Sequence, residues 1–461
     1  MRKLIGTKEF YKMALMIALP LMVQNGITSF VNLLDNLMVG RLQTESMTGV
    51  SITNQLLFVF QLSVFGGVSG AGIFTAQFFG KGDHDGVRYT FRYKLIVTAA
   101  LSVIAFCLFY FAGDRLIELF LYEDNAGDIA LCRREALSYL RIMMFTVFPF
   151  VLTQCYGDTL RECGQTVVPM MASVVAIGVN LCFNYVLIFG KLGFPMLGVR
   201  GAAIATLISR VVECCVLIVF TGKNARRFPF IKGAWRSLYI PGPLTGHITR
   251  KGLPLLFNEL AWSAGMAMMA QCYSTRGLSV VAAYQICQTI WQLFTIVAFA
   301  LGTSVGIIVG QKLGAGELEK ARDYAWKLIA FATAVAAVFG GVLALCSSLF
   351  PQLYNTTAEV RALAARMLII MGLFLPLVTF THGSYFTLRC GGKTLITLLF
   401  DSVFVWLVNI PLAWCLSRYT GLPIVPLFAL CQSPEVLKCC LGFGMVKSGK
   451  WIQNLTELEL P

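Results

Sequence analysis

Residues 310–317 have the sequence Gly-Gln-Lys-Leu-Gly-Ala-Gly-Glu, and residues 77–83 have the related sequence Gln-Phe-Phe-Gly-Lys-Gly-Asp. One shift of 234 residues, without a gap, aligns these stretches and their surroundings: Leu19-Pro20-Leu21 with Leu253-Pro254-Leu255, Gly72 with Gly306, Gln77 with Gln311, Gly80 with Gly314, and Arg88 with Arg322. A later shift of 228 aligns Leu160-Arg161 with Leu388-Arg389. The chain is therefore expected to contain two repeated halves.

Apolar stretches long enough to cross a bilayer surround these motifs. Of 461 residues, 57% are hydrophobic and 13% are charged, whereas a soluble domain is about a quarter charged. Because about 20 apolar residues span the hydrocarbon core as a helix, we predict an all-α polytopic membrane protein with twelve transmembrane helices. The predicted spans lie near residues 13–39, 48–79, 89–112, 131–156, 166–190, 198–220, 252–275, 280–311, 323–350, 358–386, 394–416 and 422–445.

The number of spans in each half determines the predicted topology. Six spans return the chain to its starting side, so we predict two parallel six-helix bundles related by a pseudo-twofold axis along the membrane normal. The predicted parts are an N-terminal bundle at 1–221, a basic linker at 222–251, and a C-terminal bundle with a short tail at 252–461. Most of the 37 Lys and Arg lie in the N-terminus, the even-numbered loops and the tail. The positive-inside rule therefore predicts that both termini are cytoplasmic.

Composition also excludes several classes of partner. The net charge of +14 comes largely from these loops, so membrane orientation explains it and no nucleic-acid partner is expected. Most of the 15 cysteines lie in apolar runs without zinc-ligand spacing, which indicates packing residues. Residues 391–394, Gly-Gly-Lys-Thr, imitate the end of a phosphate-binding loop, but Thr387 stands where that motif needs Gly. We therefore expect no nucleotide, metal or other cofactor, and an ion gradient as the energy source.

Span one has a polar stripe on one helical face, formed by Asn25, Thr28, Ser29, Asn32, Asp35 and Asn36. Such a face should line a cavity or a helix interface, because lipid cannot satisfy it. Rise along the helices puts Asp35, Asn180, Asn184 and Thr206 at similar depth in the outer half of the first bundle. A carboxylate among amide and hydroxyl oxygens can bind a proton or coordinate sodium, so we predict a cation site there. The alternative is that Asp35 hydrogen-bonds neighbouring helices or caps the helix end near Gly40.

Every other ionisable residue predicted inside a span calls for an explanation, because a charge in the bilayer core costs free energy. Glu213 follows Arg210 by three residues, and this pair can neutralise itself as a structural element. Glu259, near the start of span seven, is a second candidate for proton or sodium coupling, with packing or hydrogen bonding as the alternative. Asp401 has no partner on its own helical face, and its role stays open. His382 is expected to be an interhelical residue rather than a titrating one.

Uncharged polar side chains follow one face of span two and of its repeat counterpart, span eight. Amides mixed with aromatic rings can hold varied amphipathic molecules, and the rings attract organic cations. We therefore predict a central substrate cavity, with plain helix packing as the alternative for any single residue. Its predicted lining is Asn32, Asn54, Gln55, Phe58, Trp262, Gln285, Gln288 and Tyr385.

Together and in this order, the motifs resemble the MATE (multidrug and toxic-compound extrusion) family along nearly the whole chain. The stretch 310–317, followed by Ala321-Arg322, is similar to the family's signature after span eight. The other stretches that fit are Leu19-Pro20, Asp35, Val39-Gly40, the residues 77–83, Leu160-Arg161-Glu-Cys-Gly164, Gly201-Ala-Ala-Ile-Ala-Thr206 and Leu388-Arg389-Cys-Gly-Gly392. The resemblance implies a V-shaped transporter whose two bundles open alternately to each side of the membrane.

The resemblance also bears on the candidate residues. The family often has Asp in span one, an Asn-x-x-x-Asp pair in span five and Thr in span six. Asn184 replaces the second Asp of that pair, which leaves Asp35 as the principal candidate in the first half. Some branches couple cations through a span-seven Glu together with a span-ten Asp. Here the Glu is Glu259, but the span-ten stretch at 377–382 has no Asp.

We therefore expect a cation-coupled antiporter, driven by protons or sodium, that exports small amphipathic or cationic organic compounds. Sodium, if it is the coupling ion, would bind at Asp35 or Glu259. The expected location is the bacterial inner membrane, with the lipid bilayer and small-molecule substrates as partners. The alternative is a flippase for lipid-linked oligosaccharides or other lipids, which should show a cationic cavity for phosphates. No clustered catalytic residues indicate an enzyme, so enzymatic activity is not expected.

Overall fold

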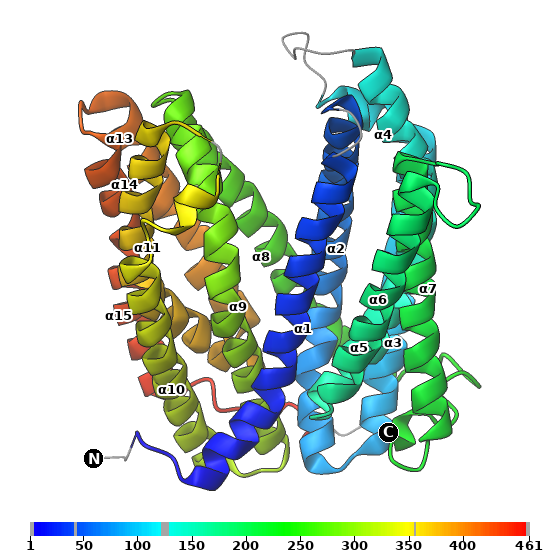
Figure 1. The fold of residues 1–461 in the computed structure, drawn as a ribbon. Helices are drawn as coiled ribbons and strands as arrows, with labels where there is room; N and C mark the ends of the chain where they lie inside the picture. The colour runs from blue at the N-terminus through cyan, green and yellow to red at the C-terminus, as the bar shows by residue number, and fades with distance from the viewer. Residues whose placement is uncertain (1–3, 41–43, 121–128, 355, 458–461) are drawn as a thin grey trace. The chain divides into compact units, whose positions relative to one another are not determined.

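The computed structural model describes residues 4–40, 44–120, 129–354 and 356–457, except for the side chains of residues 32–37, 40 and 44. The described chain folds into helices joined by short connections (Figure 1). The helices are α1 (Lys8–Gly40), α2 (Thr44–Lys81), α3 (His84–Glu118), α4 (Ile129–Met143), η1 (Met144–Thr146), α5 (Val147–Glu162), α6 (Val167–Phe189), α7 (Val199–Lys223), η2 (Pro229–Ile231), α8 (Gly242–Ser274), α9 (Leu278–Gly314), α10 (Leu318–Leu345), η3 (Phe350–Leu353), α11 (Ala358–Cys390), α12 (Thr394–Leu398), η4 (Leu399–Val403), η5 (Val405–Asn409), α13 (Ile410–Tyr419), α14 (Ile424–Gln432) and α15 (Pro434–Ser448).

Eleven helical segments of the described chain are long and apolar enough to cross a membrane. They include α4 to α5, α12 to α13 and α14 to α15, each of which counts as one span. α8 is not among the eleven, since Asn258 and Glu259 interrupt its apolar sequence, but at 33 residues it is long enough to span. Large apolar side chains such as Phe111 and Leu407 are exposed, as expected for surfaces that face lipid. The chain is a multi-pass α-helical membrane protein, as predicted.

The chain forms two compact units. Among the described residues, unit 1 takes in those up to 22, 76–82 and those from 247 on, and unit 2 takes in those within 23–75 and 83–246. α1 and α2 therefore each contribute to both units. In addition, α8 begins at Gly242, so residues 242–251 of the predicted linker are helical.

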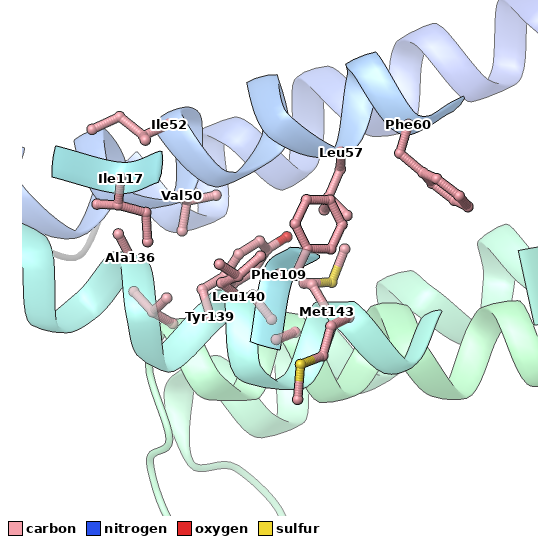
Figure 2. Close-up of a cluster of buried hydrophobic side chains, with 14 of the residues drawn as sticks. Val50, Ile52, Leu57, Phe60, Phe109, Ile117, Ala136, Tyr139, Leu140 and Met143 are labelled. Atoms are coloured by element: carbon pink, nitrogen blue, oxygen red, sulfur yellow. The ribbon is translucent and has the colours of Figure 1, made fainter. Parts of the chain in front are cut away.

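Unit 2 has a core of apolar side chains from α2, α3, α4 and α5 (Figure 2). Leu140 and Ile117 are fully buried, and Tyr139 and Phe109 are nearly so. α4 buries one face only, which explains why its sequence mixes apolar with charged residues. This core holds α2 against α4 and α5, the helices that later form a cleft with α7.

Inside unit 1 the two copies of the repeated motif meet at the ends of α2 and α9. A Cβ on Gly80 would lie 1.9 Å from the carbonyl oxygen of Gln311, and a Cβ on Gly314 would lie 1.8 Å from that of Gln77. Only glycine permits such an approach of two backbones. The contact explains why residues 76–82 join unit 1, and why both copies keep a glycine at this position.

The small-residue face of α9 packs closely, as the pattern Gly302, Gly306 and Gly310 predicts. A Cβ on Gly302 would lie 2.8 Å from the ring of Phe386 on α11, and one on Gly310 would lie 3.1 Å from the Cβ of Ala76. α9 and α11 therefore pack along this face.

The C-terminal residues are a packed part of unit 1. Gln77, fully buried, donates to the carbonyl of Cys390 at 2.9 Å and accepts from the backbone N–H of Leu455 at 2.7 Å. Trp451 is 1% exposed and donates to the carbonyl of Val446 at 3.0 Å. The segment after α15 thus closes over the repeated motif.

The connection between α7 and α8 is held on unit 2 by arginine side chains of α3. Arg92 donates to the carbonyls of Gly233 at 2.8 Å, Tyr239 at 2.9 Å and Ala234 at 3.1 Å. Trp235 donates to the hydroxyl of Tyr156 on α5 at 3.0 Å. Residues 233–239 of the basic linker are therefore docked on α3 and α5. All 15 cysteines are free, eight of them buried, in agreement with a packing role for those eight.

Candidate cation and substrate sites

Three of the four residues predicted for the first cation site meet in unit 2. Asn184 donates to the Oδ1 of Asn180 at 3.0 Å, and Asn180 donates to the Oγ1 of Thr206 at 3.4 Å. Asn180 and Asn184 lie four residues apart on α6, and Thr206 lies on the adjoining helix α7. Both asparagines are buried. The structure thus brings together neutral oxygens from two membrane helices, as their predicted depths required.

The fourth residue of that site, Asp35, and the cavity residue Asn32 belong to α1, whose backbone is helical there. Their side chains lie outside the described residues. The placement of both side chains therefore stays a prediction from the sequence.

A small cleft lies beside Thr206 within unit 2, with a volume of about 40 Å³. Small-molecule sites are larger, at roughly 300–1,000 Å³. Its lining comes from α2, α4 to α5, and α7: Leu57, Phe60, Gln61, Met143, Thr146, Val147, Phe150, Thr206 and Arg210. The wall is mostly apolar, with a few polar groups and one guanidinium.

Arg210 and Glu213 form the predicted ion pair, at 3.0 Å on α7. The second oxygen of Glu213 accepts from the hydroxyl of Ser173 on α6 at 2.6 Å. Gln24 on α1 donates to the same hydroxyl at 2.7 Å, and its own oxygen accepts from Arg161 at 3.1 Å. This chain of hydrogen bonds connects α1, α5, α6 and α7. The sequence indicated its first pair alone.

Unit 1 has a different polar cluster, centred on Asp401. Lys438 on α15 donates to Oδ1 of Asp401 at 2.7 Å, and Asn258 on α8 donates to Oδ2 at 3.1 Å. Asn258 is 1% exposed and also contacts the hydroxyl of Tyr385 on α11 at 3.4 Å. Asp401 therefore has hydrogen-bond partners from two other helices, α8 and α15, although its own helical face offered none.

Glu259 and Tyr385 lie at one end of this cluster. Tyr385 donates to Oε1 of Glu259 at 3.4 Å, and Tyr385 is 8% exposed. Glu259 thus neighbours the Asp401 pair through the two side chains of Asn258 and Tyr385. The predicted coupling residue and a predicted cavity residue are in contact. The role of each stays a prediction.

Asp401 lies in the first of two π-helical stretches. η4 and η5 interrupt the helix between α12 and α13, and such widened turns often occur at functional sites. Ser402, fully buried, donates to the carbonyl of Asn258 at 2.6 Å and to its Oδ1 at 2.8 Å. Trp406 donates to the carbonyl of Ala261 at 2.9 Å. These bonds fasten the widened turns to α8.

His382 on α11 is held locally, as expected for an interhelical residue. Its Nδ1 lies 2.9 Å from the carbonyl of Val378, and its ring stands edge-on to Phe299 of α9 at 4.7 Å between centroids. Nearby, Thr381 donates to Glu435 of α15 at 2.5 Å.

The predicted substrate stripes lie on helix faces of differing exposure. Asn54, Gln55 and Phe58 are exposed on α2. On α9, Gln285 is exposed, while Gln288 is half-buried and donates to Tyr284 at 2.5 Å. Trp262 is half-buried on α8. None of these side chains lines the cleft in unit 2, and their role in substrate binding stays a prediction.

Known proteins with the same architecture match this chain. The profile of the MatE family matches residues 20–186 and 254–415. The chain belongs to the MatE family. The two matches begin at Pro20 and Pro254, and 254 − 20 equals the repeat shift of 234. The family assignment made from the motifs is therefore confirmed, and so is the internal repeat.

Curated MatE-family relatives are similar over nearly their whole length. A probable multidrug resistance protein NorM from Thermotoga maritima is 24% identical over 96% of this chain and 93% of the relative. A protein of the same name from Halalkalibacterium halodurans is 26% identical over 90% of this chain and 89% of the relative. Among solved structures, an outward-facing multidrug resistance MATE family transporter of the MOP superfamily matches with a TM-score of 0.85. It is 21% identical and covers 97% of this chain and 98% of that one. The predicted all-α fold is thus the MATE fold.

Sequence reasoning missed several residues of these MatE-family sites. Asn258 directly precedes Glu259, and Lys438 lies within the predicted span at 422–445. Their link to Asp401 joins residues 143 and 37 positions apart, so no spacing rule reveals it. A charge of each sign inside different spans was the available signal, because buried charges are normally paired.

A second missed pair lies in unit 2. Lys94, 0% exposed on α3, donates to Glu162 and to the hydroxyl of Thr159 at 3.1 Å, both on α5. Lys94 and Lys438 are thus basic residues inside the described helices, and each is neutralised by a carboxylate.

Among the described residues, no group of three His, Cys, Asp or Glu side chains could hold a metal ion.

In the connection before α10, Lys320 and Lys312 donate to Glu317 at 3.0 and 3.1 Å. These hydrogen bonds hold the pKa of Glu317 below its usual value. Glu317 therefore stays charged at neutral pH and ties the repeated motif to the start of α10.

Proposed function

We propose that this MatE-family protein is a cation-coupled antiporter, driven by protons or sodium, that exports small amphipathic or cationic organic compounds across the bacterial inner membrane. The names of the curated relatives support export of drugs. The observation that carries the coupling proposal is the group of Asn180, Asn184 and Thr206 inside unit 2. With Asp35, predicted beside it, this group would offer one negative charge among neutral oxygens.

The proposed mechanism exchanges one bound ion for cargo. A carboxylate without bulk water favours a bound proton or sodium ion, because an uncompensated charge is costly there. Binding of a substrate would displace this ion, and re-entry of an ion from outside would release the substrate. Each transport cycle would thereby use the ion gradient.

The flippase alternative would call for a cationic cavity able to hold phosphates. Lys94 and Lys438 do not supply it, since each ion-pairs with a largely buried carboxylate, 16% and 20% exposed respectively. The antiporter is therefore the better-supported proposal.

Asp35→Asn tests this function. We expect ion-driven export of a cationic dye from proteoliposomes to fall at least about tenfold. The amide of the variant can neither take up and release a proton nor supply the negative charge that would hold a sodium ion. Runs with and without sodium identify the ion. Asp114→Asn is the matched control, since Asp114 is half-exposed at the end of α3 and pairs with Arg133. Wild-type export by Asp35→Asn, with normal folding, would refute the assignment.

A further inference from the structure

We propose that the linker between α7 and α8 carries a binding surface for anionic phospholipids, formed by residues 223–239 of unit 2. The occupant is the phosphodiester headgroup of a lipid such as phosphatidylglycerol, with its acyl chains against the exposed rings of the linker. This surface is independent of the ion coupling proposed above.

The positive charge of the linker is not compensated by nearby acidic residues. The sequence has no Asp or Glu between Glu213 and Glu259. The exposed cations of the linker are Lys223, Arg226, Arg227, Lys232 and Arg236. Among the described residues, none of these five forms an ion pair. An anionic headgroup can therefore bind here without displacing a carboxylate.

Buried side chains of the linker fix the backbone that carries these cations. Phe228 and Phe230 are both buried, and the ring of Phe230 lies 5.6 Å from that of Phe91 on α3 between centroids. The hydrogen bonds of Arg92 and Trp235 hold the following residues. Because the surface is already ordered, little conformational entropy is lost when a headgroup binds.

The linker also exposes large apolar side chains beside its cations. Trp235 is 58% exposed, and Leu238 and Tyr239 are exposed as well. Exposed apolar groups that lie together mark contact surfaces, and Trp and Tyr gather at the level of the headgroups in membrane proteins. A free phosphate or a nucleic acid would leave this apolar surface in water, whereas a lipid covers it with its acyl chains.

The depth of the linker along the membrane helices also fits a headgroup. α3 has 35 residues and is about 52 Å long, so it extends about 11 Å beyond each side of a hydrocarbon core of about 30 Å. Arg92 follows the first residue of α3, His84, by about 12 Å, and Tyr156 precedes the last residue of α5, Glu162, by about 9 Å. Their hydrogen bonds therefore hold residues 233–239 at the level of the headgroups.

Quenching of tryptophan fluorescence by brominated lipids tests this proposal on the full chain in phosphatidylcholine nanodiscs. One set of nanodiscs contains brominated phosphatidylglycerol, and a matched set contains the same fraction of brominated phosphatidylcholine. The difference between wild type and Trp235→Phe isolates the signal of Trp235. We expect phosphatidylglycerol to bind there at least about fivefold more tightly than phosphatidylcholine, which is the factor that one nearby cation contributes.

Two double variants separate this surface from a general attraction to charge. Lys232→Gln with Arg236→Gln removes the cations on either side of Trp235 in the sequence, and should reduce the preference to within about twofold. Lys191→Gln with Arg200→Gln is the matched control, because it removes two exposed cations at the opposite end of α7. This control should keep the wild-type preference.

Native mass spectrometry of lipids retained by the purified proteins gives a second measurement that needs no Trp235 variant. Wild type and the control should retain phosphatidylglycerol, and Lys232→Gln with Arg236→Gln should lose it.

Equal binding of the two lipids at Trp235 would overturn the proposal, and so would a preference that survives Lys232→Gln with Arg236→Gln. Millimolar inorganic phosphate should leave the preference unchanged. If it abolishes the preference, the surface binds free phosphate and the lipid assignment is wrong. Binding of a short single-stranded RNA, without any preference between the two lipids, would assign the surface to nucleic acid instead.

Discussion

At the residue scale, the Asp401–Lys438 pair is the ionic centre of unit 1. Its atoms are 2.7 Å apart, and the side chains are 20% and 11% exposed. Asn258 takes the second oxygen of Asp401 and is itself held by Ser402. Such an arrangement compensates a buried charge with a partner and with hydrogen bonds, which is the condition for its tolerance inside a membrane protein.

We predict that Lys438→Met lowers the free energy of unfolding by about 3–5 kcal/mol, because it leaves Asp401 buried without its cation. The added change Asp401→Asn should restore most of that loss, since Asn can still accept from Asn258. Unfolding of the detergent-solubilised protein by increasing SDS measures both.

Lys447→Met is the matched control, because Lys447 is exposed on the same helix. Its effect should stay within about 0.5 kcal/mol. A stability loss from Lys447→Met equal to that from Lys438→Met would contradict the special role of the buried pair.

At the element scale, the ends of α2 and α9 meet through their backbones. Glycine at positions 80 and 314 makes the approach possible, and Gln77 binds the C-terminal segment on the other side. The two repeat copies therefore contact each other reciprocally, and a change in either one disturbs both helix ends.

Gly80→Ala is expected to destabilise unit 1 by about 1–3 kcal/mol, as overpacking of a tight contact does. Gly341→Ala on α10, where nothing lies within 4 Å, should instead be neutral or stabilising by up to about 1 kcal/mol. The same unfolding assay compares them. Equal effects of the two substitutions would show that the crossing tolerates a side chain.

At the scale of the whole molecule, the repeat preserves helices but not polar sites. Continuing the shift of 228, Asn180 and Asn184 of unit 2 correspond to Val408 and Leu412 of unit 1. Unit 1 instead places its polar cluster on α8, η4 and α15. The halves thus share packing while each has its own chemistry.

Whole-molecule topology yields a prediction from charge. Because Lys and Arg gather in the N-terminus, the even-numbered loops and the tail, both ends of the chain should be cytoplasmic. A green fluorescent protein fused to the C-terminus should fluoresce, and alkaline phosphatase at the same place should be inactive. Active phosphatase there would reverse the predicted orientation.

The sequence by itself determined the membrane class, the repeat and the family. Hydropathy identifies the spans because lipid cannot form hydrogen bonds with the backbone, so the chain must cross as apolar helices. The repeat is visible from the constant shift of 234 residues that matches Gln77 with Gln311. It also predicted the local pair of Arg210 with Glu213, since positions three apart share a helical face.

The tertiary structure alone decided which distant groups meet. Lys438 reaches Asp401, and Lys94 reaches Glu162. Helix spacing cannot foresee these contacts, because they depend on how whole helices rotate and pack. The π-helical turn η4 is a further feature that only the structure reveals, since sequence periodicity does not predict an extra residue in a helical turn.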